Sequence, residues 1–241
     1  MLWISLRKKK ILQFPFKKLT MKLGNKKLMS ILLGFLILIC TNTFAQVPAG
    51  FNIISEKQSQ DLSEKIEKKQ ATIKTMQMDF VQEKEMKMMR NKAVMNGKLF
   101  FQKANTLKVE YIDPVVMHIW MNNGQWAMKD GKGKISKFNE KSMPSLYYIN
   151  QMLLESVQGS IIKSKHFSSK VYENKQQYFV LLKPQVKELQ NWFEEIHLYI
   201  NKSDLLVQTI LLKENKDEYT LMKMKQIQTN KPINPNVFKV R

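Results

Sequence analysis

The chain has 241 residues, of which 40 are Lys or Arg, 20 are Asp or Glu and one is Cys. This composition excludes a collagen-like repeat, a disordered tail and a disulfide scaffold. A net charge of +20 points to nucleic acid or an anionic membrane, but nine basic residues and no acidic ones lie in residues 1–45. The other 196 residues carry a net charge of +11, and they suffice to bury the core of one domain.

Residues 1–45 have the pattern of a secretory signal peptide. Two lysines precede the apolar run Leu28–Cys40, and small residues follow at Thr43 and Ala45. The run is shorter than the roughly 20 apolar residues of a transmembrane helix. We therefore expect export, cleavage after Ala45 and a mature chain, residues 46–241, that forms a single domain.

The start of the leader has two alternatives, Met1 and Met21. A leader that begins at Met21 has an ordinary length, and residues 1–20 would then lie upstream of the true start. Cys40 follows Ile39 instead of the small residue that precedes a lipidated cysteine, which favours an unmodified apolar residue. The mature chain then has no cysteine, which excludes disulfides, thiolate nucleophiles and cysteine-bound metals.

The first element expected in the mature chain is an amphipathic helix over residues 55–75. Ser55 and Gln58 have the spacing of an N-terminal capping box. Apolar residues then recur at helical spacing from Leu62 to Ile73. So thin an apolar stripe is typical of a helix that docks on a sheet, and it also suits a helix that can lift away.

Beyond this helix the sequence period changes to two, which is typical of strands. Apolar and polar residues alternate over residues 76–81, 107–111 and 196–201, and turn residues separate such runs. Strands at this close spacing predict an antiparallel meander or barrel. Residues 115–121 and 178–182 are apolar on both faces, so we expect them to be central strands.

A second helix is expected over residues 144–154, with Pro144 in its first turn. Its apolar residues nearly encircle it. The helix must therefore be covered on most sides, or it must cover an apolar surface itself.

The sequence offers little for catalysis or metal binding. His118, His166 and His197 are far apart and lack ligand spacing, and the neighbours Glu194 and Glu195 point to opposite faces of one strand. The sequence contains no Gly-rich phosphate loop, dinucleotide fingerprint or serine nucleophile elbow. We therefore expect a protein that is not an enzyme and that has no metal and no cofactor.

Methionine is the unusual part of the apolar composition, since 13 of the 16 methionines lie beyond residue 45. They either fill an ordinary core or form an adaptable pocket for acyl or other hydrophobic ligands. Likewise, the basic cluster of Lys84, Lys87, Arg90 and Lys92 is either a solvated face or a contact for anionic lipid head groups. Export from the cytoplasm argues against nucleic acid as a partner.

Six segments, in order along the chain, carry motifs of one known family. They are residues 78–82, 97–111, 123–126, 196–199, 217–220, and 230–233 with Phe238. The first contains F-x-Q, and residues 97–111 are similar to the stretch G-x-L-x-[FV]-x-[RK]-P-N-x-[LF]-R-W-x-Y. Together these segments resemble the LolA-type family of periplasmic lipoprotein carriers, and the resemblance covers most of residues 70–240.

The resemblance implies an α+β, mainly β fold, in which helices lid the apolar concave face of an incomplete antiparallel β-barrel. It also implies a monomeric periplasmic carrier that ferries acylated lipoproteins from the inner to the outer membrane. The implied partners are an inner-membrane ATP-driven lipoprotein-release complex and an outer-membrane acceptor. The alternative is a related envelope carrier or sensor of another lipid or hydrophobic metabolite, and an envelope enzyme is a distant third.

Strand alternation and the second helix together define the ligand cavity that we expect. Leu99 and Phe101 share one face of their strand, as Leu107, Val109 and Tyr111 do on the next. The ten residues expected to line the acyl cavity are Phe80, Leu99, Phe101, Leu107, Val109, Tyr111, Trp126, Met128, Tyr148 and Met152.

Lys103 stands where the family has an arginine that contacts the helical lid and influences release. Lysine keeps the charge but loses the planar fork of arginine, and Ala104 and Val109 replace the proline and tryptophan of the family stretch. We expect the Lys103 ammonium to bond a carbonyl at the C-terminal end of a lid helix. The alternative is a solvated lysine without a role in release.

Overall fold

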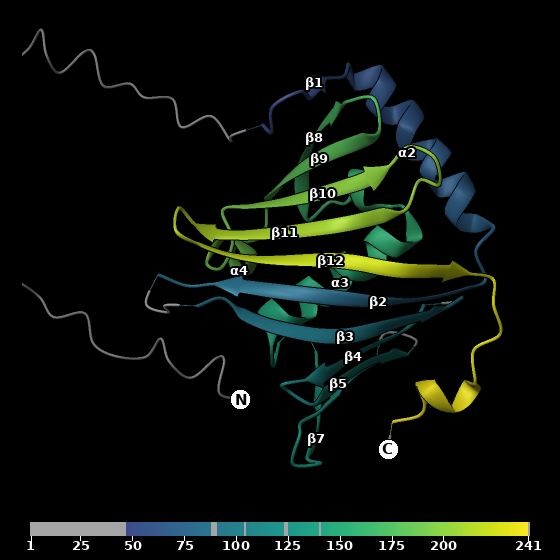
Figure 1. Ribbon diagram of the computed structural model, residues 1–241, viewed down its shortest axis with the longest axis vertical. Coiled ribbons are helices and arrows are strands. Elements are labelled where there is room, and N and C mark those ends of the chain that lie inside the picture. Colours follow the sequence, from purple (N-terminus) through teal and green to yellow (C-terminus); the bar gives the residue numbers. More distant parts are fainter. Residues whose placement is uncertain (1–46, 88–90, 104, 123–124, 140, 241) are drawn as a thin grey trace, which may run out of the picture. The chain divides into compact units, whose positions relative to one another are not determined.

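The structure is a computed structural model that describes residues 47–87, 91–103, 105–122, 125–139 and 141–240. The expected signal peptide and its cleavage site lie outside these residues. One antiparallel sheet of twelve strands dominates the described part of the chain (Figure 1).

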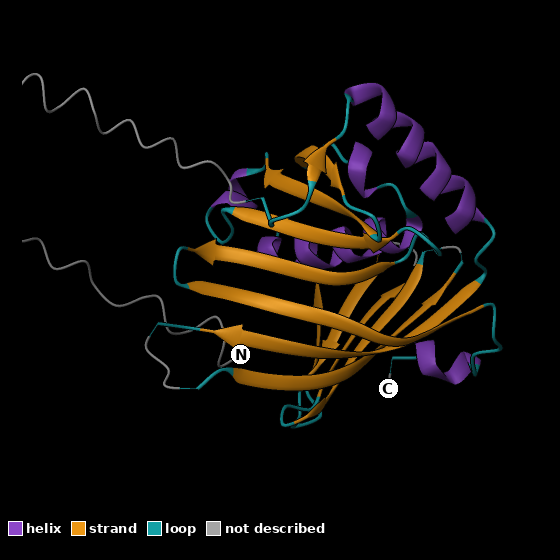
Figure 2. Cartoon of the chain, turned by 45° about the horizontal axis from the view of Figure 1, so that its top comes forward, coloured by secondary structure: helices purple, strands orange, loops and turns teal. Residues whose placement is uncertain are grey.

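The strands follow the order β1-β8-β9-β10-β11-β12-β2-β3-β4-β5-β6-β7. Their bounds are β1 (Asn52–Ile53), β2 (Thr75–Glu85), β3 (Ala93–Gln102), β4 (Thr106–Asp113), β5 (Met117–Asn122), β6 (Gln125–Lys129), β7 (Ile135–Phe138), β8 (Phe167–Glu173), β9 (Gln177–Pro184), β10 (Glu195–Asn201), β11 (Val207–Asn215) and β12 (Glu218–Thr229). The sheet curves strongly, but it does not close, because β1 and β7 remain its two edges (Figure 2). The expected incomplete antiparallel barrel is confirmed.

Two longer helices and three short ones accompany the sheet. They are α2 (Glu56–Ala71), α3 (Pro144–Gln158), α4 (Lys187–Gln190), and the 3-10 turns η2 (Ile161–Lys163) and η3 (Pro235–Phe238). No helix in the described ranges combines the length and the apolar character that crossing a bilayer requires.

The capping box predicted for α2 is present. Ser55 Oγ accepts a hydrogen bond from the Gln58 amide at 3.2 Å, and the Gln58 side chain accepts one from the Ser55 amide at 2.9 Å. The helix ends at Ala71, earlier than the expected residue 75. It ends there because the Asn230 side chain binds the backbone between the helix and β2, and the chain then extends into the strand.

The core lies on the concave side of the sheet. In β2 every second side chain is buried, beginning with Met76, Met78 and Phe80. Leu62 and Ile66 of α2 belong to the same apolar cluster. The sheet curves around α3, whose side chains join this cluster too (Figure 2).

Residues 115–121 and 178–182 belong to strands that are paired on both sides, as expected of central strands, although they are not at the middle of the sheet. They lie in and beside β5 and β9, whereas β12 and β2 occupy the middle. Both strands are buried on two faces because other segments of the chain pack against them on the convex side of the sheet. There Trp120 Nε1 donates to the Val237 carbonyl of η3, at 3.2 Å, and Phe51 packs on the Phe179 ring with centroids 5.7 Å apart.

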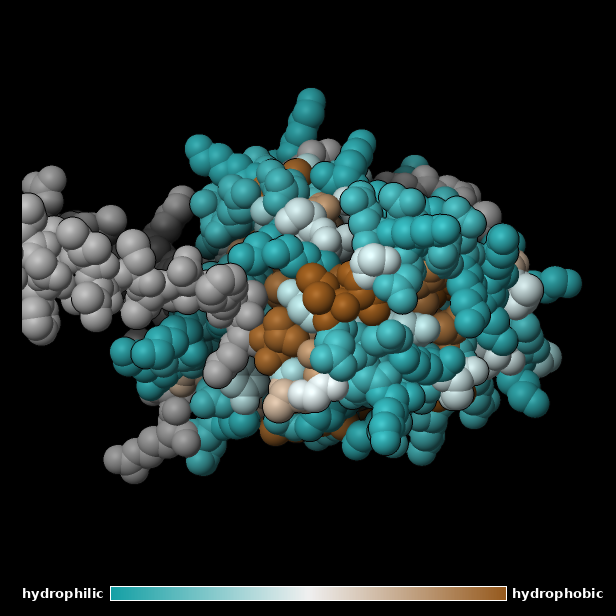
Figure 3. Space-filling view, turned by 90° about the horizontal axis from the view of Figure 1, so that it is seen from above, coloured by the Kyte–Doolittle hydropathy of each residue, from teal (hydrophilic) through white to brown (hydrophobic). Residues whose placement is uncertain are grey.

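The top of the molecule in Figure 1 includes the short edge strand β1. Seen from above, apolar side chains reach the surface there among hydrophilic ones (Figure 3). Ile53 of β1 is 64% exposed. A two-residue strand therefore leaves this edge of the sheet thinly covered.

Gly97 lets β3 approach its neighbours more closely than a side chain would permit. A Cβ at this position would overlap the Phe80 ring and the carbonyl oxygen of Glu110 in β4. The Phe80 ring occupies this space and packs edge-on against Tyr111, with centroids 5.3 Å apart. The absence of a side chain at Gly97 thus determines how closely the Phe80 ring and β4 can pack against β3.

We predict that Gly97→Ala lowers the free energy of unfolding by about 1–3 kcal/mol, the usual cost of overpacking a filled core. Urea denaturation measures the effect. Gly131→Ala is the control, because a Cβ there would lie 3.1 Å from its nearest neighbour, the Val116 carbonyl oxygen, which is tight but not an overlap. Equal stability of the two variants would contradict the packing described.

Candidate functional site

All ten residues expected to line a cavity gather in or against one apolar core. The eight fully buried ones are Phe80, Leu99, Phe101, Leu107, Val109, Trp126, Tyr148 and Met152. The other two, Tyr111 and Met128, are half-buried against the same core. The strand register places Leu99 opposite Val109 and Phe101 opposite Leu107, so the expected shared face is confirmed. That these residues contact a ligand stays a prediction.

Side chains of α2 and α3 pack closely against the concave side of the sheet. From α3, the Tyr147 ring meets Trp126 of β6 edge-on, with centroids 6.1 Å apart, and Met152 is 1% exposed. The space left between α2, α3 and the sheet is about 20 Å³. Ligand pockets usually measure roughly 300–1,000 Å³, whereas this space holds about one water molecule. An acyl chain can therefore enter only if the helices move.

The β3–β4 turn tethers α2 through Lys103. Its Nζ donates a hydrogen bond of 2.9 Å to the carbonyl oxygen of Ala71, the last residue of α2. Its backbone amide donates to the Lys74 carbonyl, also at 2.9 Å. The contact expected of Lys103 with a helix C-terminal carbonyl is thus present. The positive charge of Lys103 interacts favourably with the negative end of the helix dipole. Its effect on release stays a prediction.

The same turn tethers α3 through Asn105. The Asn105 Oδ1 accepts a 2.6 Å hydrogen bond from Gln158 Nε2 at the end of α3. Asn105 has a φ of 65°, in the left-handed region that asparagine tolerates well. A third tether, the ion pair between Lys163 and Glu67 at 3.3 Å, joins η2 to α2. All three tethers lie at exposed or half-exposed side chains, so each contributes little to stability.

One end of the concave face is polar, which the sequence reasoning missed. Lys84 is 1% exposed and pairs with Glu214, which also accepts a hydrogen bond from Thr220. Nearby, Tyr111 donates to Gln82 Oε1 at 2.9 Å, and burial raises the pKa of Tyr111 to about 12. Strand alternation could have predicted that Lys84 is buried, because it lies on the same face of β2 as Met76 and Phe80.

The four basic residues expected to form a surface cluster are therefore not all found on the described surface. Lys84 does not belong to it, and Arg90 lies outside the described residues. Lys87 and Lys92 are exposed, but they pair with Asp217 at 3.6 Å and Glu85 at 3.0 Å. Acidic neighbours thus offset much of the charge that a lipid head group would meet.

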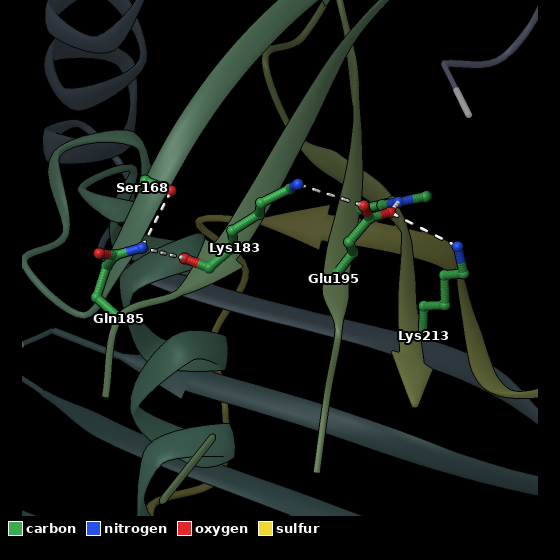
Figure 4. A network of polar contacts seen from close by, with 6 residues as sticks. Ser168, Lys183, Gln185, Glu195 and Lys213 are labelled. Carbon is green, nitrogen blue, oxygen red and sulfur yellow. Dashed lines mark hydrogen bonds and ion pairs between the residues drawn. The ribbon is translucent and has the colours of Figure 1, made fainter. Parts of the chain in front are cut away.

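A second polar network lies on the convex face, away from the helices. In Figure 4, Glu195 of β10 lies between Lys183 of β9 and Lys213 of β11, each 3.9 Å from its carboxylate. His197 Nε2 lies 3.0 Å from the same carboxylate. Within the described ranges no group of three or more His, Cys, Asp or Glu residues could hold a metal ion.

The chain matches one family model, described as "Outer membrane lipoprotein carrier protein LolA", over residues 71–241. The protein belongs to this family. No curated protein matches the chain in sequence.

Several solved structures are similar to this chain at low sequence identity. The LolA superfamily protein NE2245 from Nitrosomonas europaea is 9% identical, with 76% of this chain and 97% of that one covered, at a TM-score of 0.44. LprF from Mycobacterium bovis is 10% identical, with 76% and 97% covered and a TM-score of 0.41. A chain of the Pseudomonas aeruginosa MucA/MucB complex is 10% identical, with 76% and 61% covered and a TM-score of 0.47.

We predict that Lys103→Leu loosens α2 without unfolding the domain. Losing one exposed hydrogen bond should speed amide exchange in residues 56–71 about two- to ten-fold. Mass-spectrometric hydrogen exchange measures this, and Lys98→Leu on the preceding strand β3 is the control. Exchange rates in α2 that match the control would show that Lys103 does not hold the helix.

We also predict that His197 makes the domain less stable in mild acid. Burial lowers the pKa of His197, against the opposing effect of Glu195. The unfolded chain therefore takes up a proton near pH 6.5 that the folded chain takes up only at lower pH, so the free energy of unfolding falls below about pH 6.5. His197→Gln should reduce the stability lost between pH 7.5 and 5.5 in urea titrations. An unchanged loss would contradict this prediction.

Proposed function

We propose that the protein is a periplasmic carrier that binds the acyl chains of lipoproteins beneath α2 and α3. The observation that carries this proposal is an apolar concave face on which α2 and α3 pack, both with exposed hydrogen bonds at their C-terminal ends. Membership of the lipoprotein-carrier family supports it. Such a role needs a reversible apolar cavity and no chemistry, so we propose a protein that is not an enzyme.

The cost of opening this site is compatible with reversible loading. Within its helical span α2 buries two large apolar side chains, Leu62 and Ile66. Exposing both costs about 3–6 kcal/mol. An acyl chain gains roughly 0.8 kcal/mol for each buried methylene, so about four to eight methylenes offset the cost of moving α2. Flexible methionines such as Met76 and Met224 allow the walls to adapt to the chain.

The proposal extends to location and partners. The leader pattern supports export with cleavage after Ala45, and a mature domain of residues 46–241 that acts as a monomer in the periplasm. We propose an inner-membrane ATP-driven release complex as the donor of acylated lipoproteins, and an outer membrane acceptor as their recipient. The acyl cavity is the one defined by the core residues around Leu99 and Val109, with Lys103 governing release.

We predict that Val109→Glu abolishes binding of a fluorescent triacylated lipopeptide. Val109 is 2% exposed, and an unpaired charge at its position would cost several kcal/mol. Val94→Glu, at an exposed position on the neighbouring strand β3, is the control and should bind normally. A folded Val109→Glu that binds as tightly as the parent would show that this face does not receive acyl chains.

A measurement on the unaltered protein complements the variants. Native mass spectrometry of protein purified from the periplasm should find an acylated lipopeptide or lipoprotein bound. A different lipid or hydrophobic metabolite would favour the related carrier or sensor instead. Binding of no hydrophobic compound, either as purified or after incubation with the lipopeptide, would contradict the proposed function.

A further inference from the structure

The small space beneath the lid contains polar groups as well as apolar ones. Its apolar wall includes Met78, Leu99 and Leu153, contributed by β2, β3 and α3. Two polar side chains also face it, Gln70 from α2 and Ser156 from α3. Both are buried, with 6% and 4% of their surface exposed. A purely structural lid would be expected to place apolar side chains here.

Gln70 leaves a hydrogen-bond acceptor unused. Its Nε2 donates to the carbonyl oxygen of Leu205 at 3.2 Å, which fixes the orientation of the side-chain amide. Its Oε1 is buried, and no described residue donates a hydrogen bond to it. A buried carbonyl without a donor is costly, so a donor brought by a ligand is favoured at this position.

Ser156 adds acceptor capacity but no free donor. Its hydroxyl donates its proton to the Met152 carbonyl at 2.7 Å, which leaves only oxygen lone pairs for another group. The polar side chains lining the described space therefore offer acceptors at Gln70 Oε1 and Ser156 Oγ, and one further donor, the second N–H of Gln70 Nε2. A carboxylate or phosphate would leave the buried Gln70 Oε1 without a donor, whereas an N–H would supply one.

Gly159 shows that the chain keeps room for the Gln70 side chain. It follows α3 and has a φ of +82°, in the left-handed region. A Cβ at this position would lie 2.9 Å from Gln70 Cγ and 2.8 Å from Ile66 Cγ2. Because Gly159 has no side chain, the end of α3 can lie close to the end of α2. The Gln70 side-chain amide then remains next to the small space beneath the helices.

We propose that Gln70 Oε1 accepts the amide N–H of an N-acylated ligand and so selects acyl amides over acyl esters and free fatty acids. This inference rests on the proposed function, because the acyl chain must first displace the helices. The chain would then occupy the apolar wall below α2, with its amide next to the acceptor. Gln70 is in this sense a specificity-determining residue.

The test compares four ligands that share one hexadecanoyl chain. They are N-methylhexadecanamide, N,N-dimethylhexadecanamide, methyl hexadecanoate and hexadecanoate. Only the first carries an N–H, and each is titrated against a fluorescent acyl probe on the parent protein. The first should bind about ten-fold more tightly than the other three, the effect of satisfying one buried acceptor.

Two variants then assign the preference to a residue. Gln70→Met, which nearly keeps the shape of the side chain, should remove the preference and bind all four ligands similarly. Gln60→Met on the exposed side of α2 is the control and should keep the ten-fold preference.

The outcomes separate this inference from the proposed function. Similar binding of all four ligands to the parent would overturn the role of Gln70 while leaving an acyl-binding protein. A preference that survives in Gln70→Met would also overturn it. If none of the four ligands displaces the probe, both the inference and the proposed acyl cavity fail. Because the ligand series uses the unaltered protein, similar binding of all four ligands overturns the inference even if Gln70→Met does not fold.

Discussion

The curved sheet has an apolar concave face that it cannot cover by itself, since β1 and β7 do not meet. Exposing this face to water would cost far more free energy than any single polar contact in the molecule contributes. The helices α2 and α3, from distant parts of the chain, therefore pack onto it, and a space between them and the sheet measures about 20 Å³. The same requirement explains why the interior is closed in this structure and why a long apolar ligand could replace the helices.

Buried apolar area holds the lid in place more than its hydrogen bonds do. The contacts from the β3–β4 turn, Lys103 to Ala71 and Asn105 to Gln158, lie at the surface, where water competes for the same groups. They orient the ends of α2 and α3 without fixing them strongly. An acyl chain competes on the same terms as the helices, by burying methylene groups. Loading can thus be reversible without a covalent step or an energy source within the domain.

Local patterns in the sequence predict much of the fold and of the candidate site. The period of two places Leu99 and Val109 on one face, and the spacing of Ser55 and Gln58 marks the start of α2. Other features depend on contacts made by distant segments. The pattern of β5 predicts burial on both faces, but it does not reveal that η3, near the C-terminal end of the chain, packs on one of them. Gln70 looks like an ordinary polar residue of a helix until the fold brings it to Leu205, 135 positions away.

The central claim is that α2 must move away from the sheet when a ligand enters. Spin labels on cysteines at Gln60 of α2 and Lys98 of β3, with distances from double electron–electron resonance, test this directly. Both positions are exposed, and Cys40 is the only cysteine of the chain. We predict a longer and broader distance distribution after saturation with a triacylated lipopeptide, and a return to the starting distances when the lipopeptide is removed. An unchanged distribution with the lipopeptide bound would contradict the claim.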